Sequence, residues 1–91
     1  MNYANTKAEH VAFSRIAKRA ISQAAEIGVR LDLLTICMDL EFCHANGCPL
    51  DLDAMLTAKP SDLLHDVGGI NRHLDHATGQ LHDSFLPRFA A

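Results

Sequence analysis

Residues 65–85, HDVGGINRHLDHATGQLHDSF, decide the fold of the C-terminal half of this chain. The stretch holds four of the six histidines, three aspartates and three of the five glycines. Such a density of imidazole and carboxylate groups is typical either of a metal or proton-transfer site or of a polar, turn-rich piece of scaffold. Which of the two applies depends on how the stretch folds.

A turn at Asp75–Gly79 is the reason that a β-hairpin is predicted over residues 70–85. The aspartate can accept from the turn amides, and the glycine suits a position with positive φ. With Asp75 paired to Gln80, the facing residues become Leu74 and Leu81, Arg72 and Asp83, Ile70 and Phe85, and His73 and His82. Two apolar pairs and one opposite-charge pair on one face are favourable cross-strand contacts.

A second interpretation continues a helix through the same stretch. Its apolar residues at helical spacing are Leu63, Val67, Ile70, Leu74 and Ala77. The adjacent glycines Gly68 and Gly69 would cost such a helix about 2 kcal/mol relative to alanine. We therefore expect the hairpin and keep the long helix as the alternative.

The remaining elements are expected to be helical, which makes the fold class mainly α and the chain a single domain over residues 1–91. Helices are predicted at about residues 6–27, 33–46, 51–57 and 61–67. Thr6 and Glu9 have the spacing of a capping box, and Asp32 can cap the second helix. We expect a small helical domain in which the first two helices pack antiparallel and the hairpin closes the core.

The helix predicted at 33–46 is apolar on most of its sides. Only Asp39, Glu41 and His44 are strongly polar. Such a helix is either central in the fold or meets a partner chain. A chain of 91 residues builds only one modest core, and this helix offers more apolar surface than such a core needs. We expect a homo-oligomer, a dimer, and a protein partner.

Composition favours a soluble globular domain, with 48% hydrophobic and 21% charged residues. No apolar run approaches the ~20 residues that cross a bilayer, so no membrane contact is expected. Residues 1–10 lack the apolar stretch of a signal peptide. The three cysteines lie within twelve residues and are expected to be reduced thiols, not a disulfide framework. These features together predict a cytoplasmic protein.

Charge is unevenly distributed, and this supports an alternative function in nucleic-acid binding. Residues 1–30 carry five basic and two acidic side chains, a net charge of +3, whereas residues 31–91 carry −6. The candidate contacts on the first helix are Lys7, Arg15, Lys18 and Arg19. Stacking platforms are scarce, because the chain has no tryptophan and one tyrosine. A solvated helix face is therefore favoured over a nucleic-acid surface.

The histidines and aspartates supply a second alternative, a metal-binding protein or a metal-dependent hydrolase. Imidazole and carboxylate groups suit several divalent metals. The candidate ligands are His44, His65, Asp66, His73 and His82. A di-iron bundle site needs more glutamates than the three present, and no complete catalytic set is recognisable. The expectation is a non-enzymatic protein without a cofactor.

Two segments carry a resemblance to a known family. They are MDLEFCHANGCPLDL at 38–52 and HDVGGINRHLDHATGQLHDSFLPRF at 65–89. Both resemble a family of small uncharacterised proteins of bacteria and their phages, a domain of unknown function. The resemblance implies no activity and no site. It implies a phage or prophage setting, and hence an accessory protein that acts on a host component through protein–protein interaction.

Overall fold

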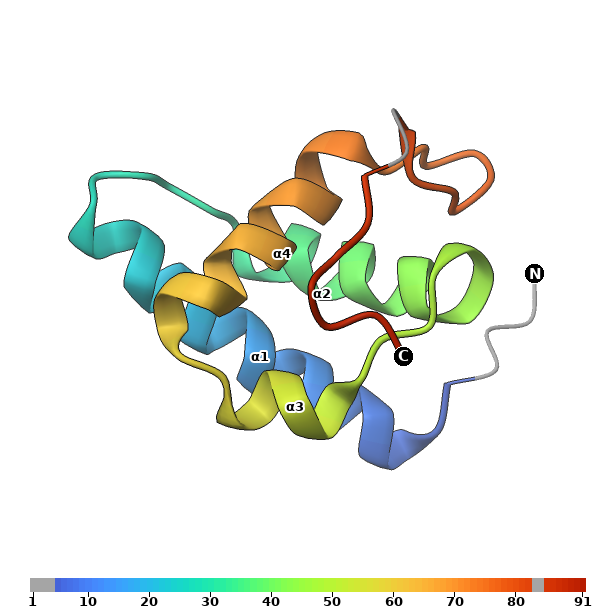
Figure 1. Cartoon of the computed structure of the whole chain (residues 1–91), viewed down its shortest axis with the longest axis horizontal. Helices are drawn as coiled ribbons and strands as arrows, with labels where there is room; N and C mark the ends of the chain where they lie inside the picture. Colours follow the sequence, from blue (N-terminus) through green and yellow to red (C-terminus); the bar gives the residue numbers. More distant parts are fainter. Residues whose placement is uncertain (1–4, 83–84) are drawn as a thin grey trace.

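The computed structural model of this chain describes residues 5–82 and 85–91. Its helices are α1 (Lys7–Glu26), α2 (Leu33–Phe42), the π-helical turn η1 (Cys43–Gly47), α3 (Leu52–Thr57) and α4 (Pro60–His73). The predicted mainly α fold class is confirmed. Helix α1 packs against α2, α3 and α4, and α2 also packs against α4 (Figure 1). Within the described ranges, no helix has the length and apolar character to span a membrane.

Side chains from the residue before each helix determine where α1, α2 and α3 begin. Thr6 and Glu9 form the predicted capping box, in which each side chain accepts from the backbone amide of the other. Asp32 and Asp51 each accept from the amide three residues further on. These acceptors satisfy amides that have no partner in the first turn of a helix. The caps that begin α1 and α2 were therefore predictable from the sequence, whereas α4 begins at Pro60 without a side-chain cap.

One core collects the buried side chains of all the helices. Its largest fully buried residues are Phe13, Ile16, Ile36, Leu40, Met55, Leu63, Val67 and Ile70. Three buried alanines of α1, Ala17, Ala20 and Ala24, leave room for close approach of the neighbouring helices. The apolar face of α1 thus contacts α2, α3 and α4 at once.

The hairpin predicted over residues 70–85 is not supported. Helix α4 begins at Pro60, runs through Gly68 and Gly69, and ends at His73. The described part of the stretch contains no β-strand. The helix predicted at 61–67 is therefore twice as long as expected. Ile70, Arg72 and His73, which were predicted on the first strand of the hairpin, belong to α4.

The turn of the predicted hairpin does form, at the end of α4. The amide of Gly79 donates to the carbonyl of Asp75, and the amide of Asp75 donates to the carbonyl of Gln80, both at 2.8 Å. A single antiparallel bridge joins Leu74 to Leu81. Pairing stops there because the residues before Leu74 are helical. The predicted contact with Asp83 lies outside the described residues.

The contact between Gly69 and the ring of Phe85 explains why the helix continues through two glycines. A Cβ atom at this position would lie 2.0 Å from the ring of Phe85, so the ring occupies the space of the missing side chain. The ring lies between His65 and His73, at centroid distances of 5.8 and 5.2 Å. Burial of the aromatic ring offsets the roughly 1 kcal/mol that glycine costs a helix.

The C-terminal segment returns along α4 and ends beside the residues that precede α3, as the red trace in Figure 1 shows. Asp66 of α4 is fully buried and accepts from the amides of Arg88 and Phe89, each at 2.8 Å. An antiparallel bridge joins Leu50 to Ala90. The tail is therefore held by the Asp66 side chain on one side and by backbone hydrogen bonds to Pro49 and Asp51 on the other.

Substitution of the two glycines should change stability in opposite directions. Gly69→Ala should lower the free energy of unfolding by about 1–3 kcal/mol, because the new methyl group displaces the ring of Phe85. Gly68→Ala should raise it by up to about 1 kcal/mol, because its Cβ meets only the end of Arg72 at 4.0 Å. Urea denaturation of both variants measures the difference. Equal responses would show that the ring does not rest on Gly69.

Candidate functional site

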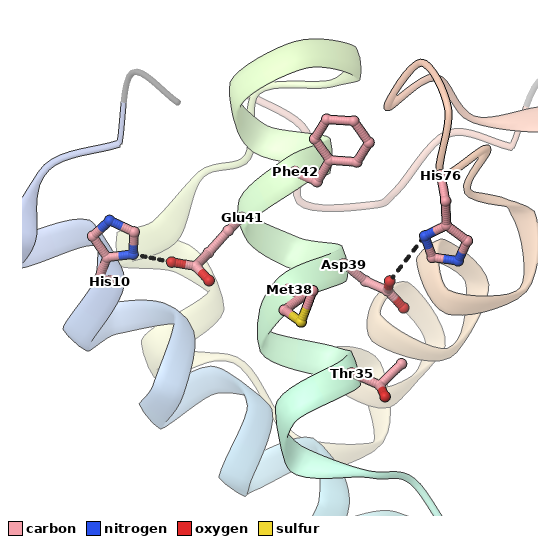
Figure 2. Close-up of a pocket in the computed structure, with 7 residues that line it drawn as sticks. All are labelled: His10, Thr35, Met38, Asp39, Glu41, Phe42 and His76. Atoms are coloured by element: carbon pink, nitrogen blue, oxygen red, sulfur yellow. Dashed lines mark hydrogen bonds and ion pairs between the residues drawn. The ribbon is translucent and has the colours of Figure 1, made fainter. Parts of the chain in front are cut away.

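The outer side of α2 combines exposed apolar side chains with a cavity. Leu34 and Met38, one helical turn apart, are 68% and 58% exposed. The adjacent cavity of 530 Å³ is lined by His10, Thr35, Met38, Asp39, Glu41, Phe42 and His76 (Figure 2). Apolar walls with a few polar groups at the edge are the usual composition of a binding pocket. We call Leu34, Thr35, Met38 and Glu41, with this cavity, the α2 surface.

The position of α2 between its neighbours explains why this surface is exposed. Ile36 and Leu40 point into the core and are buried. Leu34 and Met38 lie on the opposite side of the helix, since residues two apart on a helix point in nearly opposite directions. Helices α1 and α4 flank α2 on its two sides. The outermost side of this largely apolar helix is left open.

The α1 edge of the cavity is formed by an ion pair between His10 and Glu41 (Figure 2). The backbone carbonyl of Glu41 also accepts from the side-chain amide of Asn5, at 3.0 Å. These contacts join the start of α1 to the end of α2. They place one imidazole and one carboxylate at the rim, where solvent or a partner can reach them.

The α4 edge is formed by Asp39, which is only 3% exposed. Its carboxylate accepts from the side-chain amide of Asn71 at 2.6 Å and lies 3.7 Å from Nδ1 of His76 (Figure 2). Burial raises the pKa of the Asp39 carboxyl, while Asn71 and His76 oppose that rise. The wall of the cavity therefore contains a carboxylate whose negative charge is incompletely compensated.

His44, the first predicted metal ligand, is committed to structural contacts. Its Nδ1 accepts from the amide of Leu50 at 2.8 Å, so this nitrogen carries no proton. Its Nε2 lies 3.0 Å from the carboxylate of Glu9 and donates to it. The amide of Thr6, and then His44, lower the pKa of Glu9. Nε2 thus holds η1 against α1, and Nδ1 holds the segment after η1 at Leu50.

The other predicted metal ligands lie along α4 and its following turn. Both oxygens of Asp66 are occupied by the tail amides, and His65 Nδ1 lies 3.2 Å from one of them. His65 and His73 share the ring of Phe85, and His82 pairs with the Asp75 carboxylate at 3.5 Å. In residues 5–82 and 85–91, no three His, Cys, Asp or Glu side chains are grouped so as to hold a metal ion.

One of the four predicted nucleic-acid residues has an internal role. The guanidinium of Arg19 donates to the carbonyls of Met55 and Leu56, at 2.9 and 2.8 Å, and to that of Ala58. It satisfies the free carbonyls at the end of α3. The other three candidates, Lys7, Arg15 and Lys18, are exposed on α1.

The three cysteines are free thiols. Burial raises the pKa of Cys43 to about 12, and also raises the pKa values of Cys37 and Cys48. Because a thiolate is the nucleophile and a raised pKa disfavours it, these side chains are protonated at neutral pH. Cys43 belongs to the core, and Cys37 and Cys48 pack against it.

The candidate ligands proposed from the sequence do not include the residues that line the cavity. The sequence could have indicated Asp39 as a candidate, because a carboxylate in an apolar helix needs a hydrogen-bond partner when it is buried. The indication for Glu41 was weaker. Glu41 and His44 have the spacing of a Glu-x-x-His pair, but in the structure Glu41 pairs with His10 of α1. There was no such indication for His76, since only the docking of the turn brings it to Asp39.

The chain belongs to the family of unknown function DUF6874, whose sequence profile matches residues 8–91. This confirms the resemblance to a domain of unknown function. No curated protein and no solved structure matches the chain. Family membership assigns no activity, so the functional conclusion depends on the geometry of the α2 surface.

Two isosteric substitutions should show opposite pH dependence. Burial raises the pKa of Asp39, so its stabilising contribution is present below the unfolded-state pKa of about 3.9 and is lost as the pH rises through the folded-state pKa. Asp39→Asn should therefore be more stable than the native chain at pH 7, and the difference should shrink toward pH 4.

Asp75→Asn is the matched control for Asp39→Asn. The Ala77 amide, and then His82, lower the pKa of Asp75, so its contribution is present above the unfolded-state pKa and is lost as the pH falls through the folded-state pKa. This variant should be less stable than the native chain at pH 7. Urea midpoints measured from pH 2 to pH 8 test both signs. Parallel profiles for the two variants would contradict the assignment.

The tail contact can be tested at Asp66. Asp66→Asn replaces one acceptor by a donor that faces a backbone amide, so it should lower the free energy of unfolding by about 1.5–3 kcal/mol. Asp62→Asn removes only the exposed pair with Arg88 and should cost at most about 1 kcal/mol. Hydrogen exchange of the Arg88 and Phe89 amides should accelerate in the first variant alone. Unchanged exchange there would mean that Asp66 does not hold the tail.

Proposed function

We propose that this chain is a non-enzymatic interaction protein that binds a partner protein through the α2 surface. The observation that supports this best is the exposure of Leu34 and Met38, 68% and 58%, beside a cavity of 530 Å³. Each Å² of apolar surface removed from water stabilises a complex by roughly 25 cal/mol before the costs of association. Covering Leu34 and Met38 with a partner would therefore lower the free energy of the complex.

The edges of the α2 surface have the composition of an interface rim. Protein interfaces combine an apolar centre with a polar, partly hydrated border. Leu34 and Met38 form the centre, and the pairs His10–Glu41 and Asp39–His76 form the border. This arrangement supports specific recognition over non-specific sticking, because a partner must satisfy the polar groups as well as cover the apolar ones.

The charge of the α2 surface indicates which side chains a partner should present. Residues 33–47 contain Asp39 and Glu41 and no lysine or arginine. A complementary partner therefore presents apolar side chains together with cationic ones. Phosphate groups would be repelled by the same two carboxylates, and Arg19 is committed to α3. Neither the nucleic-acid nor the metal alternative gains support from the positions of its candidate residues.

A photo-crosslinking amino acid at position 38 tests the proposal. With p-benzoylphenylalanine in place of Met38, irradiation in lysate of the cells of origin should give discrete covalent adducts with protein, which mass spectrometry identifies. A second copy of the chain counts as a partner in this experiment. The reactive ketone lies at the centre of the α2 surface, where any bound chain must contact it.

The matched control carries the same amino acid at Thr57, an exposed position of α3, which packs against α1. It should give no discrete adduct. Absence of adducts from position 38, or the same adducts from both positions, would rule out the α2 surface as the binding surface.

A further inference from the structure

We infer that the partner of the α2 surface is a second copy of this chain, related to the first by a twofold axis. In this dimer, the exposed side of α1 of each copy lies on the α2 surface of the other. The inference rests on the proposed function and adds the identity of the partner to it. It is carried by two complementary features that lie next to each other on one side of the molecule.

The first feature is a stripe on α1, formed by Lys7, Val11 and Lys18. Their spacing of four and seven residues places them on one face of the helix. Val11 is 50% exposed, and both lysines are exposed. We call these three residues the α1 stripe. It pairs one apolar side chain with two cations, which is the chemistry that the α2 surface requires of its partner.

The α1 stripe runs along the edge of the α2 surface. His10, the neighbour of Val11, lines the same cavity as Met38 (Figure 2). Further along α1, the positive charge of Lys18 acts on the thiol of Cys37 in α2, opposing the rise in its pKa that burial causes. The stripe and the surface are therefore adjacent strips of one face of the domain.

Adjacency of two complementary strips is the condition for a self-complementary interface. A twofold axis between the strips places the stripe of each copy on the surface of the other, so every contact occurs twice. Val11 then covers Met38 and Leu34, and the lysines approach Glu41 and the cavity wall at Asp39. Both strips of both copies are covered, whereas a head-to-tail contact would leave one strip open at each end.

The charge distribution of the whole chain agrees with this arrangement. Residues 1–30 carry a net charge of +3, and residues 33–47 carry two acidic and no basic side chains other than His44. Placing α1 on α1 or α2 on α2 would bring like charges together. Only the crossed arrangement brings opposite charges together at both contacts, and such complementarity determines register and partner choice.

A charge exchange tests the dimer directly. The first variant, Lys7→Glu with Lys18→Glu, makes the stripe acidic; the second, Thr35→Lys with Glu41→Lys, makes the α2 surface basic. The native chain, of 10.0 kDa, should elute in size-exclusion chromatography with light scattering as a species of twice that mass. Each variant alone should dimerise at least about tenfold more weakly, because like charges face each other twice.

An equimolar mixture of the two variants is the decisive measurement. In the mixed dimer both contacts again join opposite charges. Light scattering should therefore again give the mass of a dimer. Native mass spectrometry should show that this dimer contains one copy of each variant. Circular dichroism and urea midpoints establish that each variant is folded. Should loss of the His10 partner unfold the second variant, Thr35→Lys alone replaces it in the mixture.

Three results would overturn the inference: a native chain that is monomeric at micromolar concentrations, variants that dimerise as well as the native chain, or folded variants whose mixture stays monomeric. The proposed function is distinguished by the crosslinker at position 38. Adducts with a different protein from a monomeric chain would keep the α2 surface as a binding surface and remove only self-association.

Discussion

The C-terminal half of this fold depends on the hydrogen bonds between the Asp66 carboxylate and the backbone amides of the tail. A fully buried carboxylate is costly unless it is hydrogen-bonded, and the amides of Arg88 and Phe89 are the donors that satisfy it. The return of the tail to α4 is therefore what allows Asp66 to be buried. Once there, the tail closes the core through the Leu50–Ala90 bridge and carries Phe85 back over Gly69.

The same closure determines the shape of the α2 surface. The turn after α4 docks against η1, where a Cβ atom on Gly47 would lie 1.9 Å from the carbonyl oxygen of Gly79. The side chain of Gln80 donates to the carbonyl of Asn46 at 3.0 Å. This docking brings His76 to Asp39 and completes one edge of the cavity. Of the histidines proposed as metal ligands, His44 holds η1 to Glu9 of α1, and His65 and His73 contact the ring of Phe85.

Prediction from the sequence succeeded where the signal was local. The capping box at Thr6 and Glu9 and the cap at Asp32 formed as expected, because each needs only a side chain and an amide three residues away. The predicted excess of apolar surface on α2 is visible as exposed Leu34 and Met38. Of the residues that line the cavity, the sequence distinguishes only Asp39 and Glu41, as polar residues in an apolar helix.

By itself, the sequence determined a mainly helical chain, the caps at the starts of α1 and α2, and an α2 with more apolar surface than one core can bury. Whether residues 65–85 form a helix or a hairpin was decided only by the tertiary structure. Counted locally, Gly68 and Gly69 cost a helix about 2 kcal/mol, and the turn at Asp75–Gly79 favours a hairpin. The compensating burial of Phe85 on Gly69 joins residues sixteen positions apart. No local pattern contains that contact, because it exists only once the tail has been drawn back onto α4.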